Sequence, residues 1–313
     1  MILVIGAMGR IGTATVAALR ARGVATRALV PHRRQVPWLL DSGAELVEDD
    51  LMGDDGTDPE VLDRLLEGVQ GVVLIARPAA EQVDLERLLV DACAERGVRR
   101  MVKWSVAGAA ENAPADAARW HWRSERHLLR TAAEPCVARS GRLMQDLLYQ
   151  TPLMLAHHMT VGCQGNGQTA DVDARDVGGV LASLAVTAEP PSAPLLVTGP
   201  EAFTQQEIAT MLGTALGLDI RHVTCTPPEL AQLLLAAGVG QWQLEDLVAY
   251  EAAVAAGSWN VVTDVVPTWT GRAARPFADF AHDVATSLQY HHFDPPARGA
   301  VQGASRRATV LAN

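Results

Sequence analysis

The sequence predicts a doubly wound α/β fold, in which helices cover both faces of a parallel sheet, followed by a smaller, mainly helical lobe. Two observations lead to this prediction. Short apolar runs alternate with helical patterns through the first half of the chain, which implies parallel strands joined by right-handed crossovers. Beyond Gly141 that alternation becomes irregular and helical patterns dominate.

The first half supplies six expected strands and four expected helices. The apolar run at 2–5 suits a strand buried on both faces. Gly23 and Gly97 stand where two helical patterns stop, and Asp58 can cap a helix ahead of Pro59. We expect strands at 2–5, 25–30, 45–48, 71–76, 101–105 and 136–139, and helices at 11–22, 58–66, 85–96 and 117–131.

The second half is expected to hold one further strand and several helices. Thr204-Gln-Gln-Glu207 has the pattern of a capping box at a helix start. We expect a strand at 195–197 and helices at 175–188, 204–216, 230–237, 244–256 and 277–288. The predicted division is a dinucleotide-binding domain at 1–142, to which 168–198 returns, a substrate lobe at 143–167 and 199–294, and a tail at 295–313.

Composition excludes several classes of protein. The chain has 313 residues, 49% of them hydrophobic, and a formal net charge of −10, which disfavours nucleic acid as a partner. The four cysteines are far apart without a CxxC pair, and the two His-His pairs diverge, so we expect no metal site. The first apolar run is too short for a signal peptide or a membrane span. We therefore expect a cytoplasmic protein with no membrane partner.

A glycine-rich segment follows the first expected strand and opens the first expected helix. It reads Gly6-Ala7-Met8-Gly9-Arg10-Ile11-Gly12. In this context the first glycine permits a tight turn, the second lets the backbone approach a pyrophosphate, and the third lets helix and strand pack closely. The segment predicts a dinucleotide site in a Rossmann-type domain.

The residues after the second expected strand favour NADP(H) over NAD(H). An NAD enzyme usually has an acidic residue there for the ribose 2′-hydroxyl, but this chain has His32, Arg33 and Arg34, with no carboxylate until Asp41. Guanidinium groups suit a 2′-phosphate, and Arg10 could join them. The alternative is that these arginines are solvated surface charges.

Several segments resemble the NmrA-like family of atypical short-chain dehydrogenase/reductases, which includes NADPH-quinone reductases and NAD(P)-sensing regulators. The resemblance extends from the glycine loop to about residue 283. The segments are Gly43-Ala-Glu-Leu-Val47, Val102-Lys-Trp-Ser105, Ala118-Arg-Trp-His121, Arg139-Ser-Gly-Arg-Leu-Met-Gln145, Asp173-Ala-Arg-Asp176 and Leu196-Val-Thr-Gly-Pro200. The resemblance implies contacts with adenine by Asp50 and Leu51, with the nicotinamide side by Ala76, Arg77 and Ser105, and with substrate by Leu143, Met144 and Gln145.

One departure from short-chain dehydrogenases bears on the chemistry. Those enzymes use Tyr-x-x-x-Lys, in which the lysine lowers the pKa of the tyrosine that passes the proton. None of Tyr149, Tyr250 and Tyr290 is followed by lysine four residues on, and Lys103 is the only lysine in the chain. Hydride transfer to an acceptor that needs little acid help, such as a quinone, remains possible.

Other side chains are candidates for the chemistry. His121 and Glu125 lie four residues apart on one expected helix, so Glu125 could orient His121 as a proton donor; the alternative is a structural histidine. Lys103 and Ser105 share one strand face, and Lys103 could contact the cofactor ribose or close the sheet edge. Arg142 could bind a substrate oxygen or form a surface salt bridge. Trp104 suits a flat ligand or the core.

Three functions remain open at this point. The first is an NADPH-dependent reductase of a small apolar carbonyl, enone or quinone. The second is an NADP(H)-binding regulator of a protein partner, which the missing dyad favours. The third is a non-redox enzyme, such as a cyclase, isomerase or lyase. A small-molecule substrate and a homodimer are expected for the enzyme, and a protein partner for the regulator alone.

Overall fold

The computed structural model describes residues 1–32, 37–49, 51, 59–76, 81–236, 241–257 and 259–290. The chain forms two compact units, the first made of Met1–Ser140, Ala174–Val197 and Thr263–Ala273, and the second of Gly141–Asp173, Thr198–Val262 and Ala274–Asn313. A return of the chain to the first unit near residue 174 was expected. The second return, at 263–273, was not, and the expected tail lies outside the described residues.

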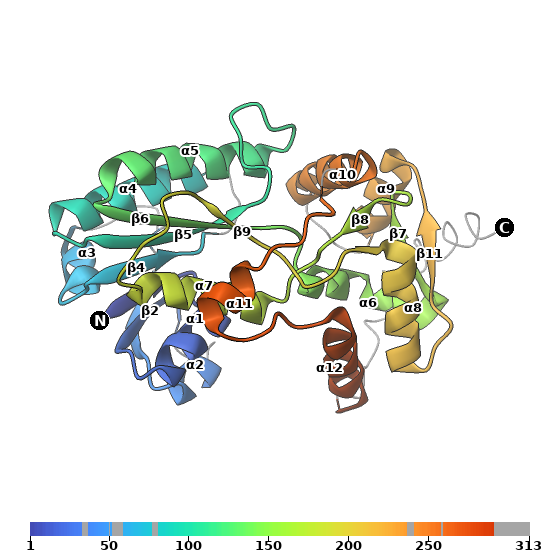
Figure 1. Cartoon of the computed structure of the whole chain (residues 1–313), viewed down its shortest axis with the longest axis horizontal. Coiled ribbons are helices and arrows are strands. Elements are labelled where there is room, and N and C mark those ends of the chain that lie inside the picture. The colour runs from blue at the N-terminus through green and yellow to red at the C-terminus, as the bar shows by residue number, and fades with distance from the viewer. Residues whose placement is uncertain are drawn as a thin grey trace. The chain divides into compact units, whose positions relative to one another are not determined.

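The first unit contains a seven-stranded parallel sheet, which confirms the predicted fold class (Figure 1). The strand order is β3-β2-β1-β4-β5-β6-β9. The order reverses between β1 and β4, and ligands of doubly wound sheets bind at the carboxyl ends of such neighbours. The strands are β1 (Ile2–Ile5), β2 (Thr26–Val30), β3 (Glu45–Glu48), β4 (Gly71–Leu74), β5 (Arg100–Val106), β6 (Glu134–Ser140) and β9 (Leu195–Val197).

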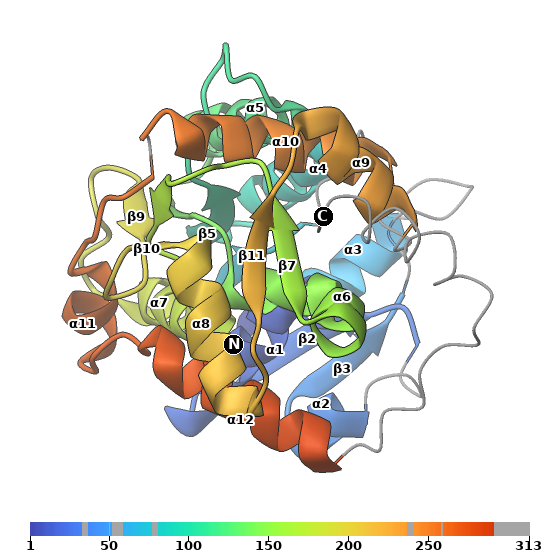
Figure 2. The ribbon, with the colours of Figure 1, turned by 90° about the vertical axis from the view of Figure 1, so that its right-hand side faces the viewer.

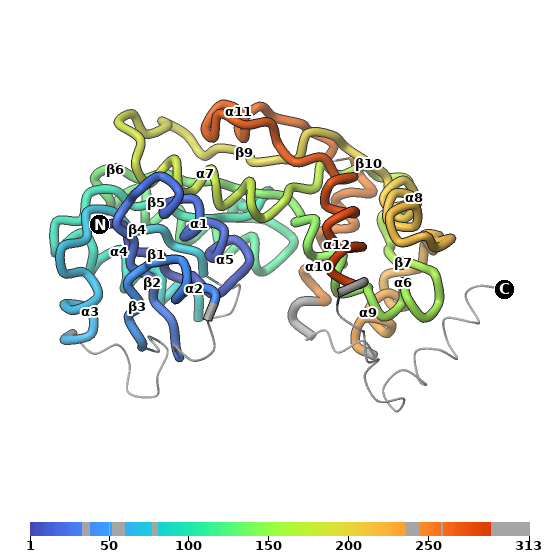
Figure 3. Tube along the Cα trace, turned by 90° about the horizontal axis from the view of Figure 1, so that it is seen from below, coloured from blue at the N-terminus to red at the C-terminus, as the bar shows by residue number. Residues whose placement is uncertain are grey.

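Helices cover both faces of this sheet. Figure 1 shows α4 (Gln82–Glu95) and α5 (Asp116–Thr131) over one face, and α1 (Arg10–Ala21), α7 (Ala174–Val186) and α11 (Val265–Thr270) on the other. Figure 3 shows α11 beside α7, although about 80 residues separate them in the sequence. The remaining helices of this unit are α2 (Pro37–Asp41) and α3 (Pro59–Leu66).

The apolar core of the first unit lies between the sheet and the α3, α4 and α5 layer. Strand side chains such as Leu3, Leu74 and Met101 meet Leu89 of α4 and Leu128 of α5 there, all with almost no exposed surface. Because α4 and α5 each follow a parallel strand, their first turns lie at the carboxyl edge of the sheet. Side chains near the start of these helices are therefore placed close to the expected ligand edge.

The second unit is mainly helical, as predicted, and also contains two small sheets. Figure 2 shows β7 and β11 side by side, and the two strands pair in parallel. The capping box at Thr204 is confirmed, since Thr204 Oγ1 accepts from Glu207 N at 3.3 Å. The elements are η2 (Met144–Gln150), α6 (Thr151–His157), β7 (Met159–Gly162), β8 (Gln168–Thr169), β10 (Phe203–Thr204), α8 (Gln205–Leu216), β11 (Arg221–Thr224), α9 (Pro227–Ala236), α10 (Gln241–Ala255) and α12 (Phe277–Tyr290).

Neither a membrane helix nor a metal cluster is found in the part of the chain that the structure describes. No helix there has both the length and the apolar character for crossing a bilayer. The described His, Cys, Asp and Glu side chains form no group of three that could hold a metal ion.

Candidate functional site

The glycine loop joins β1 to α1 in a turn that only glycine permits at two positions. Gly6 has a φ of +79°, and a Cβ added there would lie 2.0 Å from the carbonyl oxygen of Ile75. A Cβ at Gly12 would lie 2.1 Å from the carbonyl oxygen of Gly6. Both glycines are therefore required by the packing of the turn against β4 and against the first turn of α1.

Gly9 differs from its two neighbours, because the protein's own packing leaves space beside it. Its φ is −71°, and an added Cβ would approach no atom closer than the Gly6 carbonyl oxygen at 3.5 Å, an ordinary contact. Gly9 is exposed and occupies the N-cap of α1, and no side chain caps that helix. This helix end, with exposed backbone at Gly9 and no side-chain cap, fits the diphosphate of a dinucleotide.

Of the other residues of the loop, some are buried in the core and some are exposed. Ala7 and Ile11 are buried in the core, Met8 is half-buried, and Arg10 is exposed at the start of α1. An exposed Arg10 next to the open helix end is compatible with the phosphate contact that the sequence predicts.

The end of β2 brings an acidic residue near the expected 2′-phosphate site. His32 Nδ1 lies 3.5 Å from Glu48 Oε1, and both side chains are exposed. The sequence reasoning considered only carboxylates that follow β2 closely and missed Glu48. The parallel register of Val30 with Glu48 is the signal that could have identified it. Arg33 and Arg34 lie outside the described residues.

Residues implied for the adenine and nicotinamide sides are described only in part. Leu51 is buried and packs in the core of the first unit, while Ala76 is half-buried after β4. Asp50 and Arg77 lie outside the described residues.

A chain of buried polar groups links β5, α4 and α5. Lys103 Nζ lies 2.5 Å from Glu86 Oε1, and the two side chains are 1% and 2% exposed. Glu86 Oε2 accepts from Gln82 Nε2 at 3.1 Å, and the same nitrogen lies 3.2 Å from His121 Nδ1. Lys103 is thus held inside the first unit by Glu86, instead of in either environment that the sequence suggested for it.

His121 is fully enclosed and is not paired with Glu125. The rings of Trp104 and His121 make a T-shaped contact with their centroids 5.4 Å apart, and His121 Nε2 has no hydrogen-bond partner. Burial, and secondarily the charge of Lys103, lower the pKa of His121 well below its ordinary value. The expected pairing of His121 with Glu125 is therefore wrong, because His121 lies against Gln82 instead.

Glu125 instead pairs with an arginine of β6. Arg139 Nε and Nη2 donate to its two carboxylate oxygens at 2.9 and 2.5 Å. This bidentate pair neutralises the buried Glu125 carboxylate. The hydrogen bonds that the structure describes for Glu125 thus go to Arg139, and none of them goes to His121.

Ser105 and Trp104 lie close to the carboxyl end of β5. Ser105 is completely buried, and its Oγ has no hydrogen-bond partner. Trp104 is half-buried, and its Nε1 donates to Ser140 Oγ at 3.0 Å. Unpaired buried atoms such as Ser105 Oγ and His121 Nε2 are uncommon in proteins and suit contacts to a bound ligand.

The expected substrate residues of the second unit lie around a buried ion pair. Arg142 Nε and Nη2 donate to Asp171 Oδ2 at 3.0 and 2.7 Å, so its salt bridge is buried and not on the surface. Burial alone would lower the pKa of Arg142, but Asp171 and Tyr250 raise it above its usual value. Met144 is 1% exposed and packs in the core, whereas Leu143 and Gln145 are half-buried.

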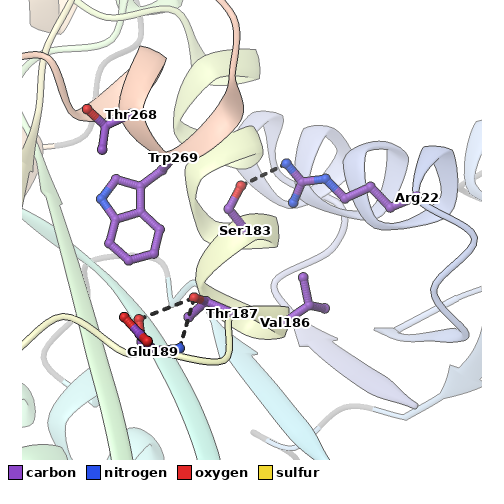
Figure 4. A pocket seen from close by; sticks show the side chains of 7 residues that line it. All are labelled: Arg22, Ser183, Val186, Thr187, Glu189, Thr268 and Trp269. Atoms are coloured by element: carbon purple, nitrogen blue, oxygen red, sulfur yellow. Dashed lines mark hydrogen bonds between the residues drawn. The ribbon is translucent and has the colours of Figure 1, made fainter.

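A shallow pocket of about 500 Å³ on the first unit is distinct from the glycine loop (Figure 4). It lies where α1 ends, about 18 Å along the helix from Gly9 at 1.5 Å per residue. Arg22 donates there to Ser183 Oγ at 2.7 Å. The lining residues are Arg22, Ser183, Val186, Thr187, Glu189, Thr268 and Trp269. This position excludes the pocket as the dinucleotide site.

Comparisons with known proteins agree with the expected family. The chain is 28% identical over 282 residues to an NAD(P)H azoreductase of Xenophilus azovorans, covering 90% of this chain and 96% of the relative. It is 30% identical over 303 residues to a (4-alkanoyl-5-oxo-2,5-dihydrofuran-3-yl)methyl phosphate reductase of Streptomyces griseus. This match covers 92% of this chain and 99% of the relative.

A solved structure extends the likeness to the fold. An NADPH-dependent quinone oxidoreductase from Escherichia coli, in complex with NADPH, superposes with a TM-score of 0.80 at 20% identity, covering 91% of this chain and 99% of that one. The expectation of an oxidoreductase agrees with both curated relatives, which are reductases by name, and the first of them is named for NAD(P)H. The model of the NmrA-like family matches residues 1–258, and the chain belongs to that family.

Proposed function

We propose that this protein is an NADPH-dependent reductase of a small, conjugated organic acceptor such as a quinone, an enone or an azo compound. The observation that carries the proposal is Gly9, an exposed residue at the start of α1 where no side chain caps the helix and an added Cβ would make only an ordinary contact. The two curated relatives, which match nearly the whole chain, are both reductases by name. Bound NADPH would supply the hydride that such a reduction needs.

The residues assigned to the cofactor follow from the loop and from the resemblance. Backbone N–H groups of the Gly6–Gly12 loop would hold the diphosphate, and Arg10 would contact it from the exposed side. His32, Arg33 and Arg34 would recognise the 2′-phosphate. Ser105 and His121 each present a buried atom without a protein partner and would face the nicotinamide end.

The test is Gly9→Ala, because the added methyl group meets no protein atom closer than 3.5 Å. The variant should fold normally but fill the space that the diphosphate needs. We expect NADPH affinity, measured by calorimetry, to fall at least tenfold with an unchanged melting temperature. Gly12→Ala is the contrasting variant, since its methyl group would overlap the Gly6 carbonyl and lower stability.

Turnover is measured on the wild-type protein by the loss of NADPH absorbance with a panel of quinones, enones and azo dyes. Consumption of NADPH with at least one class is expected. If the wild-type protein does not bind NADPH, or if Gly9→Ala binds it as tightly as the wild type, the assignment of the loop is wrong. Alanine at Arg33 and Arg34 should weaken NADPH far more than NADH, and equal losses would contradict the 2′-phosphate contact.

A regulatory function is the second candidate, and one observation favours it. The imidazole of His121 and the hydroxyl of Ser105 are both fully buried, so neither is exposed to a substrate in this structure. Tight binding of NADPH and NADP⁺ with no consumption of NADPH by any acceptor would select this function.

A further inference from the structure

We infer that Gln82, Glu86 and Lys103 hold His121 as a neutral imidazole with its proton on Nε2, so that His121 acts in the reaction as a hydrogen-bond donor to the ligand and not as an acid. The inference deepens the proposed function, and the role of His121 in a reaction rests on that function. The arrangement of the three side chains stands independently of it.

The position of the proton follows from the two hydrogen atoms of the Gln82 amide nitrogen. Nε2 of Gln82 lies 3.1 Å from Glu86 Oε2 and 3.2 Å from His121 Nδ1. Glu86 Oε2 belongs to a carboxylate and can only accept, so one amide hydrogen is directed to it. The second hydrogen is then directed to His121 Nδ1, which must be the unprotonated, accepting nitrogen. The ring proton is therefore on Nε2.

The orientation of the amide is itself fixed by its surroundings. Exchanging its oxygen and nitrogen would place Gln82 Oε1 against Glu86 Oε2, two acceptors at hydrogen-bond distance in a buried site. Glu86 in turn is held by Lys103 Nζ at 2.5 Å through its other oxygen. Lys103 thus fixes Glu86, Glu86 fixes Gln82, and Gln82 fixes the tautomer of His121.

The charges around His121 disfavour an imidazolium. Lys103 on β5 repels a second positive charge, and Glu86 on α4 is already neutralised by Lys103. Glu125, on the same helix, is neutralised by Arg139 of β6. No carboxylate in the described surroundings of the ring is left to stabilise a protonated His121.

The unpaired Nε2–H is a donor for which the described protein supplies no acceptor. We assign that acceptor to an oxygen or nitrogen of the bound ligand. His121 is 0% exposed, so a ligand reaches Nε2 only if a neighbouring side chain moves. We assign that movement to Trp104, which is half-buried and makes a T-shaped contact with the imidazole. Neutral histidines that polarise a carbonyl group are known in enzymes.

A neutral donor restricts the class of substrate. An acceptor that gains a hydride becomes an anion, and a proton from water completes the reduction. If the anion is delocalised, as in the monoanion of a hydroquinone, its conjugate acid resembles a phenol with a pKa of about 10, and a hydrogen bond suffices. An isolated ketone yields an alkoxide that is at least as basic as hydroxide and needs a true acid. We therefore expect reduction of quinones and conjugated enones, but not of isolated ketones.

The tautomer can be measured on the full-length protein by nitrogen NMR with ¹⁵N-labelled histidine. We expect His121 to show a protonated Nε2 and an unprotonated Nδ1, unchanged from about pH 5 to pH 8. The signal is identified among the nine histidines by its loss in His121→Gln. An imidazolium at neutral pH, or a proton on Nδ1, overturns the inference.

Gln82→Glu combined with Glu86→Gln exchanges the amide and the carboxylate, so that two carboxylates are not brought together. The carboxylate at position 82 then accepts hydrogen bonds, so we expect the ring proton to move to Nδ1 or the ring to become charged, and quinone turnover to fall about 10²–10³-fold as for a lost oxyanion donor. Gln206→Glu is the matched control, because its Oε1 accepts from the exposed backbone N–H of His222 and a carboxylate can do the same.

The outcomes separate the inference from the proposed function. If the exchanged pair Gln82→Glu, Glu86→Gln leaves the tautomer unchanged, Gln82 does not fix it and the inference fails. Should this double variant not fold, the wild-type spectrum still decides the tautomer. If the predicted tautomer is found but no acceptor is reduced, the proposed function fails while the arrangement stands. Rapid reduction of isolated ketones would contradict the substrate class.

Discussion

Replacing Lys103 by methionine tests how strongly the first unit depends on its buried ion pair. Methionine keeps most of the volume but removes the ammonium group, so the Glu86 carboxylate, 2% exposed, retains only the hydrogen bond from Gln82. Removing one partner of a buried pair costs about 3–5 kcal/mol, because the remaining charge is left unpaired away from water. We therefore expect Lys103→Met to lower the free energy of unfolding by about that amount.

The measurement is urea denaturation followed by circular dichroism. Lys103→Met combined with Glu86→Gln should recover most of the loss, because no unpaired charge remains. Arg99→Met is the exposed control, since Arg99 pairs with Glu134 at 2.9 Å with 73% of its side chain exposed, and should cost less than about 1 kcal/mol. A loss below about 1 kcal/mol in Lys103→Met, or a double variant less stable than the single one, would refute the reasoning.

Two further predictions concern pH and cofactor choice. Burial, and secondarily the charge of Arg142, lower the pKa of His222 to about 4. As pH drops from about 6.5 towards 4, His222 is protonated in the unfolded chain but not in the folded one, so the free energy of unfolding falls. The loss of stability should reach up to ~3 kcal/mol in melting curves recorded across this pH range, and His222→Gln should abolish it. If the variant loses as much stability at low pH as the wild type does, His222 is not the cause. Glu48→Gln should raise the affinity for NADPH several-fold, because a carboxylate near the 2′-phosphate repels that phosphate. Calorimetry with NADPH and NADH checks this prediction. An unchanged ratio of the two affinities would contradict it.

Much of the first unit could be predicted from the sequence because its signals are local. The buried parallel strands give continuous apolar runs, as at Ile2–Ile5, and the glycine loop has a fixed place between strand and helix. The capping box of α8 involves residues three apart and was likewise readable. The strands of the second unit are two to four residues long, and such short runs give no periodicity to detect.

The partners of charged side chains were less predictable, because they come from distant parts of the sequence. Glu86 lies 17 residues before Lys103 on a different element, and only the packing of α4 against the sheet brings the two together. The same holds for Asp171, 29 residues after Arg142. In each case the sequence identified the cation as unusual but not the carboxylate that neutralises it.

The helix that carries His121 and Glu125 shows why correct spacing led to an incorrect pairing. Four residues at 3.6 per turn leave two side chains about 40° apart around the axis. That offset suffices for His121 to meet Gln82 of α4 while Glu125 meets Arg139 of β6. The direction in which neighbouring charge shifts the pKa of His121 is thereby reversed. The charge that acts on the ring is the Lys103 ammonium, which lowers the pKa, and not the Glu125 carboxylate. The spacing of His121 and Glu125 therefore did not predict the partner of the histidine, because Arg139 of β6 engages the glutamate.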